Sequence, residues 1–262
     1  MSAIYDGIAA EYISNRESIP AELLSSLKIR GIDFDGAKIA DFGAGPGFLS
    51  DLLSAEGGIV DAVEPVEEFI NHGKEKFKNN NKVNFNLRHA EESGLPSKTY
   101  DIVFVLSGWH WFRRTEAIAE AERILKPDGY LIIADINIER KAGIVKDTMK
   151  IIKRNRKKYK VDSRLHINKK EQRIINFPVS WIGEWQGHNF EIKDLYKKSY
   201  RQEFDREEWI RRLGTYRSLV EFKKKHRRKT LEKIDRHLKE HYEDEKYKIR
   251  HELSVVVLKN KN

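Results

Sequence analysis

The sequence contains no cysteine, and this absence removes several classes of protein at once. Without thiols the chain cannot carry a disulfide scaffold, a thiolate zinc site, an iron–sulfur cluster or a cysteine nucleophile. It also lacks an apolar run of about 18 residues, so we expect no membrane-spanning helix. Residues 1–7 show no basic stretch followed by an apolar one, which argues against a secretory signal. These absences predict a cytoplasmic protein.

The chain does have enough apolar mass for a sizeable core. Of its 262 residues 39% are hydrophobic, including 12 Phe, 10 Tyr and 5 Trp, which argues against a disordered chain. The formal net charge of +9 is unevenly placed, because residues 1–140 carry −8 and residues 141–262 carry +17. A basic half can meet an acidic substrate, an RNA or a membrane surface, although a solvated lysine-rich helical surface is the simpler explanation.

Residues 37–136 alternate between short apolar runs, typical of buried strands, and amphipathic stretches, typical of helices. We expect strands at 37–42, 59–63, 83–87, 101–106 and 130–134, and helices at 48–55, 65–77 and 115–125. Thr115 is expected to cap the third of these helices, and residues 126–129 are expected to form a turn. Strands that alternate with helices of this length predict a parallel sheet with right-handed crossovers.

The pattern changes after residue 140, and the first 30 residues differ from both parts. The beginning of the chain is predicted to be helical, with Pro20 near a helix start. An apolar row at Ile144, Val145, Ile151 and Ile152 predicts a basic helical region within 141–176. Beyond it we expect an aromatic loop at 177–188, a strand at 190–204, a basic helix at 216–242 and a final strand at 249–258.

The first strand leads into a glycine-rich turn, Asp41-Phe-Gly43-Ala-Gly45-Pro-Gly47-Phe48. Alternating glycines allow a helix N-terminus to approach a ligand without an intervening side chain, although such a turn can also serve only to pack helix on strand. A dinucleotide fingerprint needs Gly or Ala where Phe48 stands, and Asp41 would repel a pyrophosphate but suits a ligand with a positive amine. Glu64 ends the second expected strand, where a carboxylate can accept hydrogen bonds from both hydroxyls of a ribose.

With these residues the chain resembles the class I S-adenosylmethionine-dependent methyltransferases, in particular the small-molecule, methyltransferase type 11-like group. The resemblance covers residues 1 to about 136, and its motifs occur in the family's order. Its parts are Tyr5–Tyr12 with Arg16, Asp41–Gly47, Glu64, Ala90-Glu91-Glu92 before Leu95-Pro96, Tyr100–Phe104, His110-Trp-Phe112 and Arg123–Gly129.

The resemblance implies a role for each matching residue. Gly43, Ala44, Gly45 and Gly47 would let the backbone approach the methionine part and sugar of the cofactor, while Asp41 would lie near its amine. Glu64 would bind the ribose, with Pro65 beside the adenine, and Ala90 would offer its backbone amide to an adenine nitrogen. Ser107 would place main-chain atoms near the methionine amine or the sulfonium, and Tyr12 and Arg16 would close a lid. The family often has Asp where His89 stands, so His89 or Glu91 would have to accept from the adenine amino group.

The same resemblance implies an α/β fold, a Rossmann-like three-layer sandwich. Its seven-stranded sheet would be mostly parallel, with the last strand antiparallel, and would carry a helical cap. The domains expected are N-terminal lid helices at 1–30, a cofactor-binding core at 31–140, and a cap and substrate region at 141–262 that includes the last two strands of the sheet. The protein would be a monomer or a homodimer, and no metal is expected.

Methyl transfer from a sulfonium is one in-line displacement, so alignment and exclusion of water supply much of the catalysis. A hydroxyl or carbon acceptor also needs a base, and His110 is the candidate, although it can equally serve to orient its neighbours. An acceptor pocket is expected from Trp109, Trp181, Trp185 and Tyr216, for which simple core packing is the competing explanation. The basic stretches 153–158 and 223–229 would suit an acidic acceptor if they do not merely face solvent.

Two other functions are compatible with the sequence. One is methylation of RNA, suggested by the basic half, although no added RNA-binding module is recognisable and Ser107–His110 stand where base-amine methyltransferases carry an Asn/Asp-Pro-Pro-Tyr/Phe tetrapeptide. The other is a non-catalytic binding protein that keeps the fold as a scaffold. A nicotinamide-dependent dehydrogenase is disfavoured by Phe48 and by the lack of a second mononucleotide-binding half.

Overall fold

A computed structural model describes residues 9–15, 19–140, 143–162, 171–243 and 245–262. Its centre is a seven-stranded sheet in the order β3-β2-β1-β4-β5-β9-β8. The strands are β1 (Lys38–Phe42), β2 (Ile59–Glu64), β3 (Val83–Leu87), β4 (Tyr100–Leu106), β5 (Leu125–Ile138), β8 (Phe190–Phe204) and β9 (Tyr247–Asn260). Strands β1 to β5 are parallel, whereas β9 runs antiparallel to both of its neighbours. The predicted sheet, mostly parallel with an antiparallel last strand, is therefore confirmed.

Helices cover both faces of this sheet and make the three layers. The helices α3 (Glu22–Lys28), α4 (Phe48–Ala55) and α5 (Glu67–Lys76) pack on one face, and α6 (Arg114–Ile124) and α8 (Val179–Gln186) pack on the other. Alternation along β4 separates the two cores, because Ile102 and Phe104 join the first while Val103 and Val105 join the second. Burial on both faces explains why β4 reads as a continuous apolar run.

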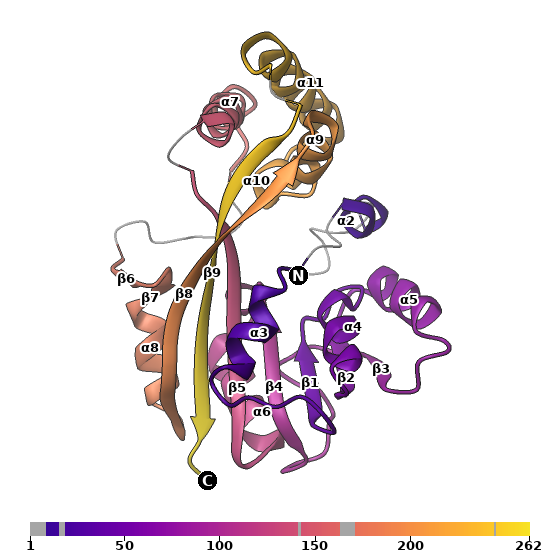
Figure 1. Ribbon diagram of the computed structural model, residues 1–262, viewed down its shortest axis with the longest axis vertical. Coiled ribbons are helices and arrows are strands. Elements are labelled where there is room, and N and C mark those ends of the chain that lie inside the picture. Colours follow the sequence, from indigo (N-terminus) through magenta and orange to yellow (C-terminus); the bar gives the residue numbers. More distant parts are fainter. Residues whose placement is uncertain (1–8, 16–18, 141–142, 163–170, 244) are drawn as a thin grey trace.

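The strands β5, β8 and β9 run beyond the parallel part of the sheet and support a helical cap (Figure 1). Strand β8 has 15 residues and β9 has 14, against five to seven in β1 to β4. The cap consists of α7 (Gly143–Lys158), α9 (Arg206–Gly214), α10 (Arg217–Val220) and α11 (Lys224–His241). It has an apolar cluster of its own, built around Trp209, Leu213 and Ile234. The cap segments follow β5 and β8, the fifth and sixth strands of this sheet along the chain.

Two details of the first half differ from the sequence-based expectation. Thr115 does not cap α6, because the helix begins at Arg114 and its N-cap is Arg113, which has no side-chain cap. The Arg113 backbone N–H instead donates to the Glu91 carboxylate at 2.8 Å, and this bond supplies the missing partner at the helix start. Residues 126–129 are not a separate turn but a bulged part of β5, since pairing with β4 moves from Tyr100–Leu125 to Ile102–Tyr130.

Two further differences lie in the second half. Residues 177–188 are not a loop, because they form the short strand β7 (Phe177–Pro178), which pairs with β6 (Arg173–Ile174), and then α8. The basic helix expected at 216–242 is interrupted after α10 and resumes in α11, with Phe222 buried between the two. In the region expected to be helical at 141–176, α7 ends at Lys158, and residues 163–170 lie outside the described part of the chain.

Candidate functional site

The glycine-rich turn connects β1 to α4 at the carboxyl edge of the sheet. Gly43, Gly45 and Gly47 all have positive φ angles, of 71°, 57° and 91°. A Cβ on Gly47 would lie 2.7 Å from the Phe85 ring and 2.9 Å from that of Phe77, so this position excludes a side chain by space as well as by conformation. The turn is therefore a bare backbone surface at the N-terminus of α4, as a close-binding ligand requires.

Glu64, the last residue of β2, lies directly against this turn. Its side chain is 1% exposed, Oε2 accepts from the Gly45 N–H at 3.0 Å, and Oε1 accepts from the Val66 N–H at 2.9 Å. Burial raises the pKa of Glu64 to about 7, in spite of these two bonds. Each carboxylate oxygen has a second lone pair, so the group can still accept from a ligand hydroxyl.

A second buried carboxyl group, Asp41, lies one strand away on β1. It is 1% exposed and accepts a hydrogen bond of 2.7 Å from the Ser50 hydroxyl of α4. Burial raises its pKa to about 7, and the Ser50 bonds oppose that rise. Within the described ranges neither Asp41 nor Glu64 forms an ion pair. Two uncompensated acids at the edge of a Gly-rich turn match a ligand that brings hydroxyl donors and a cation.

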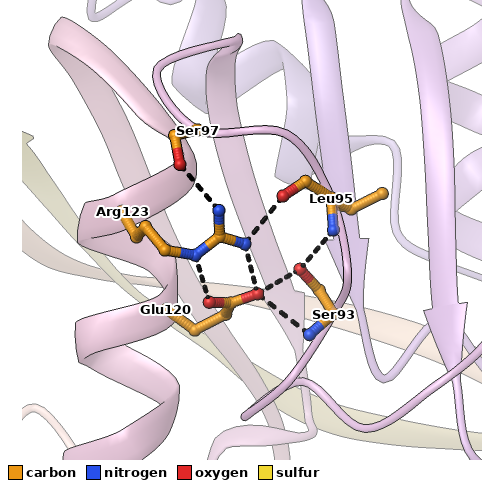
Figure 2. A network of polar contacts seen from close by, with 5 residues as sticks. All are labelled: Ser93, Leu95, Ser97, Glu120 and Arg123. Atoms are coloured by element: carbon orange, nitrogen blue, oxygen red, sulfur yellow. Dashed lines mark hydrogen bonds and ion pairs between the residues drawn. The ribbon is translucent and has the colours of Figure 1, made fainter.

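The segment between β3 and β4, which carries the residues predicted to bind adenine, is held in place by α6 (Figure 2). Glu120 accepts from the Ser93 N–H at 2.9 Å and from the Ser93 hydroxyl. Arg123 pairs with Glu120 at 2.7 Å and donates to the Leu95 carbonyl, also at 2.7 Å. This network anchors the backbone just after Ala90, which is 3% exposed.

The two candidates for binding the adenine amino group differ in their contacts. His89 forms an isolated bridge with Glu92, which closes a tight turn around Ala90. One oxygen of Glu91 is already used by the Arg113 N–H. Both residues thus lie in the segment between β3 and β4, and one oxygen of Glu91 is used at the start of α6.

Ser107 and His110 follow β4, which pairs with β1, so both lie at the same edge as the glycine-rich turn. Ser107 has φ 54°, an uncommon conformation for a residue with a side chain, and its N–H donates to the Ala134 carbonyl at 2.7 Å. His110 lies in the short 3₁₀ helix η1 (Trp109–Trp111), half-buried, with its ring 4.9 Å from that of Trp111.

Helix α2 (Ala9–Asn15) connects this edge of the core to the cap. The Tyr12 ring packs 5.3 Å from Phe69 of α5, close to the end of β2. On its other side α2 meets the cap, where Arg227 pairs with Glu11 at 2.9 Å and Arg212 donates to the Asn15 carbonyl at 3.1 Å. Arg16, the other residue expected in the lid, lies outside the described part of the chain.

The structure does not bring the four residues expected to wall the acceptor pocket together. Trp109, Trp181 and Trp185 belong to the core cluster on the α6 and α8 face of the sheet. Trp185 is fully buried, with its ring 5.6 Å from Phe177. Tyr216 lies in the cap instead, where it packs edge-on against Trp209. The tryptophans of α8 thus have the environment of core residues.

Sequence reasoning missed Asp135, a lone acid within the apolar run of β5. It is half-buried just beyond the last pairing of β4 with β5, and burial raises its pKa to about 7. The available signal was a charged residue that interrupts Leu131–Ile138, where alternation predicts an inward-facing side chain.

Two kinds of feature are absent from the described residues. None of their helices has the length and apolar character needed to cross a bilayer. They also contain no group of three or more histidine or acidic side chains arranged to hold a metal ion.

Comparison with known proteins gives this site a family. Residues 40–133 match the family model of the methyltransferase domain. An uncharacterized methyltransferase of Mycobacterium tuberculosis is 29% identical over 155 residues, which cover 59% of this chain and 61% of that protein. The ubiquinone/menaquinone biosynthesis C-methyltransferase UbiE of Campylobacter jejuni is 29% identical over 116 residues, 41% of this chain and 48% of that one. The chain therefore spans less than two thirds of these curated relatives.

Solved structures show the same fold. The Haemonchus contortus phosphoethanolamine N-methyltransferase 2, solved with phosphomonomethylethanolamine and S-adenosylhomocysteine, aligns with a TM-score of 0.58 at 15% identity. That alignment covers 100% of this chain and 60% of the other, and at such identity it speaks for the fold alone. The sequence match identifies residues 40–133 as a methyltransferase domain, and the strand order and the glycine-rich turn agree with the class I S-adenosylmethionine-dependent methyltransferase fold.

Proposed function

We propose that this protein transfers the methyl group of S-adenosylmethionine to a small-molecule acceptor. The observation that carries the proposal is the pair of buried carboxyl groups, Asp41 and Glu64, on either side of a turn whose three glycines have positive φ angles. Burying two such groups without a cation is unfavourable in the empty protein, and a ligand with an ammonium group and a diol relieves that cost.

We assign the cofactor contacts as follows from these positions. Glu64 accepts hydrogen bonds from the ribose hydroxyls, because its oxygens are fixed by Gly45 and Val66 and each retains a free lone pair. Asp41 attracts the methionine ammonium group, while the backbone of Gly43 to Gly47, with Ala44 among them, faces the methionine part and sugar. Pro65 lies beside the adenine, and the Ala90 amide donates to an adenine nitrogen.

The bound cofactor supplies a methyl group already activated on a sulfonium. The chain then has three tasks: to hold the acceptor in line, to exclude water and to remove a proton where the acceptor carries one. We assign the exclusion of water to α2 with Tyr12, because this helix joins the cofactor edge to the cap through Phe69 and Arg227. Ser107 positions main-chain atoms beside the sulfonium, and His110 on η1 is a candidate for proton removal.

The acceptor enters between this edge and the cap in our proposal, and we propose that it carries an acidic group. The support is electrostatic, since residues 141–262, which include the cap, carry a net charge of +17. The names of the related proteins include both a C-methyltransferase and an N-methyltransferase, so they do not select the accepting atom.

Methyl transfer is tested with methyl-labelled S-adenosylmethionine and a panel of small acids, each paired with its neutral analogue. We expect labelled product and S-adenosylhomocysteine to form in equal amounts, with acids preferred. Cofactor binding without turnover on any compound would favour a non-catalytic scaffold. A salt-sensitive gel shift with total RNA, together with label in RNA, would instead favour RNA methylation.

A further inference from the structure

Asp135 has a location that the cofactor contacts do not explain. The last pair between β4 and β5 is Leu106–Ala134, and the Ser107 N–H extends that ladder by donating to the Ala134 carbonyl at 2.7 Å. Asp135 is the next residue of β5 and therefore stands level with Ser107 at the carboxyl edge of the sheet. Alternation puts its side chain on the face of Ile133, which packs in one cluster with Val105 and Trp109.

The charges around Asp135 leave its carboxylate without a direct counter-ion. Arg173 of β6 is near enough to favour the ionised form, but its guanidinium donates to the Asn176 carbonyl at 2.7 Å. The cross-strand neighbour on β9 is the buried Ser254, which accepts from Asn176 at 2.9 Å. Within the described ranges Asp135 has neither a hydrogen bond nor an ion pair to its carboxylate.

A second acid close to Ser254, which lies on β9 itself, does have a counter-ion. Glu252, two residues from Ser254, pairs with Lys197 of β8 at 3.1 Å. Both acids lie close to Ser254, but Glu252 is neutralised by an ion pair and Asp135 is not. An acid kept half-buried and unpaired beside the reacting edge of an enzyme is typical of a functional group, because a structural role would be served by a neutral residue at lower cost.

We propose that Asp135 binds the ammonium group of the methyl acceptor and takes a proton from it, so that the substrate is an amine. This inference rests on the proposed methyl-transfer function and names its substrate class. A cationic group is the complement of a lone carboxylate, and a hydrogen-bonded ammonium gives the charge-assisted contact that the site lacks. An acceptor with both an amine and an acidic group would satisfy Asp135 and the basic cap together.

The reaction balances with the groups named. The ammonium N–H proton passes to the Asp135 carboxylate, which leaves a neutral amine with a free lone pair. That lone pair forms the N–C bond to the methyl group while the C–S bond breaks, and its electrons remain on sulfur. The products are a methylated ammonium ion and S-adenosylhomocysteine, and protonated Asp135 returns its proton to water. A carboxyl group whose pKa is raised to about 7 can both accept and release this proton near neutrality.

The test is a carboxyl carbon NMR titration of protein labelled at aspartate and saturated with S-adenosylhomocysteine, using methylammonium chloride as the probe. Asp135→Asn identifies the signal of Asp135, and Asp128, exposed on the same strand and paired with Lys259, serves as the internal control. We expect methylammonium to lower the midpoint of Asp135 by one pH unit or more, which is about a tenfold preference of the probe for the ionised form. Ethanol or sodium chloride at the same concentration should not.

The inference would be overturned if the titration midpoint of Asp135 did not change with methylammonium, or if it changed equally with sodium chloride. Turnover of hydroxyl or carbon acceptors, with none of matched amines, would do the same. Calorimetry with S-adenosylhomocysteine alone separates this failure from that of the proposed function. If the wild type does not bind it, both proposals fall, whereas binding with an unresponsive Asp135 removes only the amine assignment.

Discussion

Binding of S-adenosylhomocysteine should become tighter as the pH rises through 7. In the empty protein the pKa values of Asp41 and Glu64 are both raised to about 7, so near neutrality each group is protonated in about half of the molecules. The ligand brings an ammonium group and ribose hydroxyls, and both stabilise the ionised carboxylates. Complex formation must therefore release protons, and affinity must fall as the pH drops below 7.

The magnitude follows from the size of the shift. One pKa unit corresponds to about 1.4 kcal/mol, so a ligand that lowers the pKa of Glu64 from about 7 by about two units binds roughly 2.7 kcal/mol more tightly at a pH well above 7 than at a pH well below 5, and about 2 kcal/mol of this falls between pH 5 and 7.5. The whole effect is about a hundredfold change in the dissociation constant for one group, and Asp41 adds to it. The ligand's own amine and carboxyl groups keep their charges across this range, so they do not contribute.

The assay is isothermal titration calorimetry at four pH values between about 5.5 and 7.5, each in two buffers of different ionisation enthalpy. The buffers report the number of protons released directly. Glu64→Gln should bind more weakly at neutral pH and lose part of the pH dependence, whereas Glu67→Gln, on the exposed first turn of α5, is the matched control. An affinity that is flat or falls with rising pH would refute the assignment of these carboxyl groups to the cofactor.

Further predictions concern single residues. Asp41→Asn should flatten the stability of the empty protein against pH, because an acid with a raised pKa stabilises the fold at low pH and loses that contribution as the pH rises through 7; thermal melts at pH 5 and 8 measure it. Glu120→Ala removes the anchor of the 89–97 segment and should cost about 2 kcal/mol, or roughly 4–8 °C in melting temperature, with weaker cofactor binding; an unchanged melt contradicts the network. Gly47→Ala should destabilise more than Gly45→Ala in chemical denaturation, since a Cβ on Gly47 would meet the rings of Phe85 and Phe77 whereas one on Gly45 would meet nothing within 4 Å. His110→Ala should leave S-adenosylhomocysteine affinity intact and lower turnover, and a collapse of affinity would place His110 in the cofactor pocket.

The sheet and the glycine-rich turn could be predicted from the sequence because both depend on local patterns. Apolar runs and amphipathic stretches alternate clearly up to residue 136, and a turn that needs three positive φ angles can hardly be built without glycine. Glu64 could be named in advance because a strand end fixes its place beside that turn.

The helices and strands of the second half are harder to predict from the sequence because they depend on tertiary packing. Helix α8 begins directly after Pro178 and contains glycine, so its composition suggested a loop, yet Trp181 and Trp185 are one turn apart and pack on the sheet. The break between α10 and α11 exists because Phe222 turns into the cap core, which no local pattern shows. Asp135 went unnoticed since its significance lies in the partners that it lacks.

The most direct test of the account is a crystal structure of the protein with S-adenosylhomocysteine. The account predicts ribose hydroxyls on the Glu64 carboxylate, adenine against the Ala90 backbone, and the methionine ammonium group beside Asp41. Nucleoside density elsewhere in the molecule, or a ligand whose ribose makes no contact with Glu64, would contradict it.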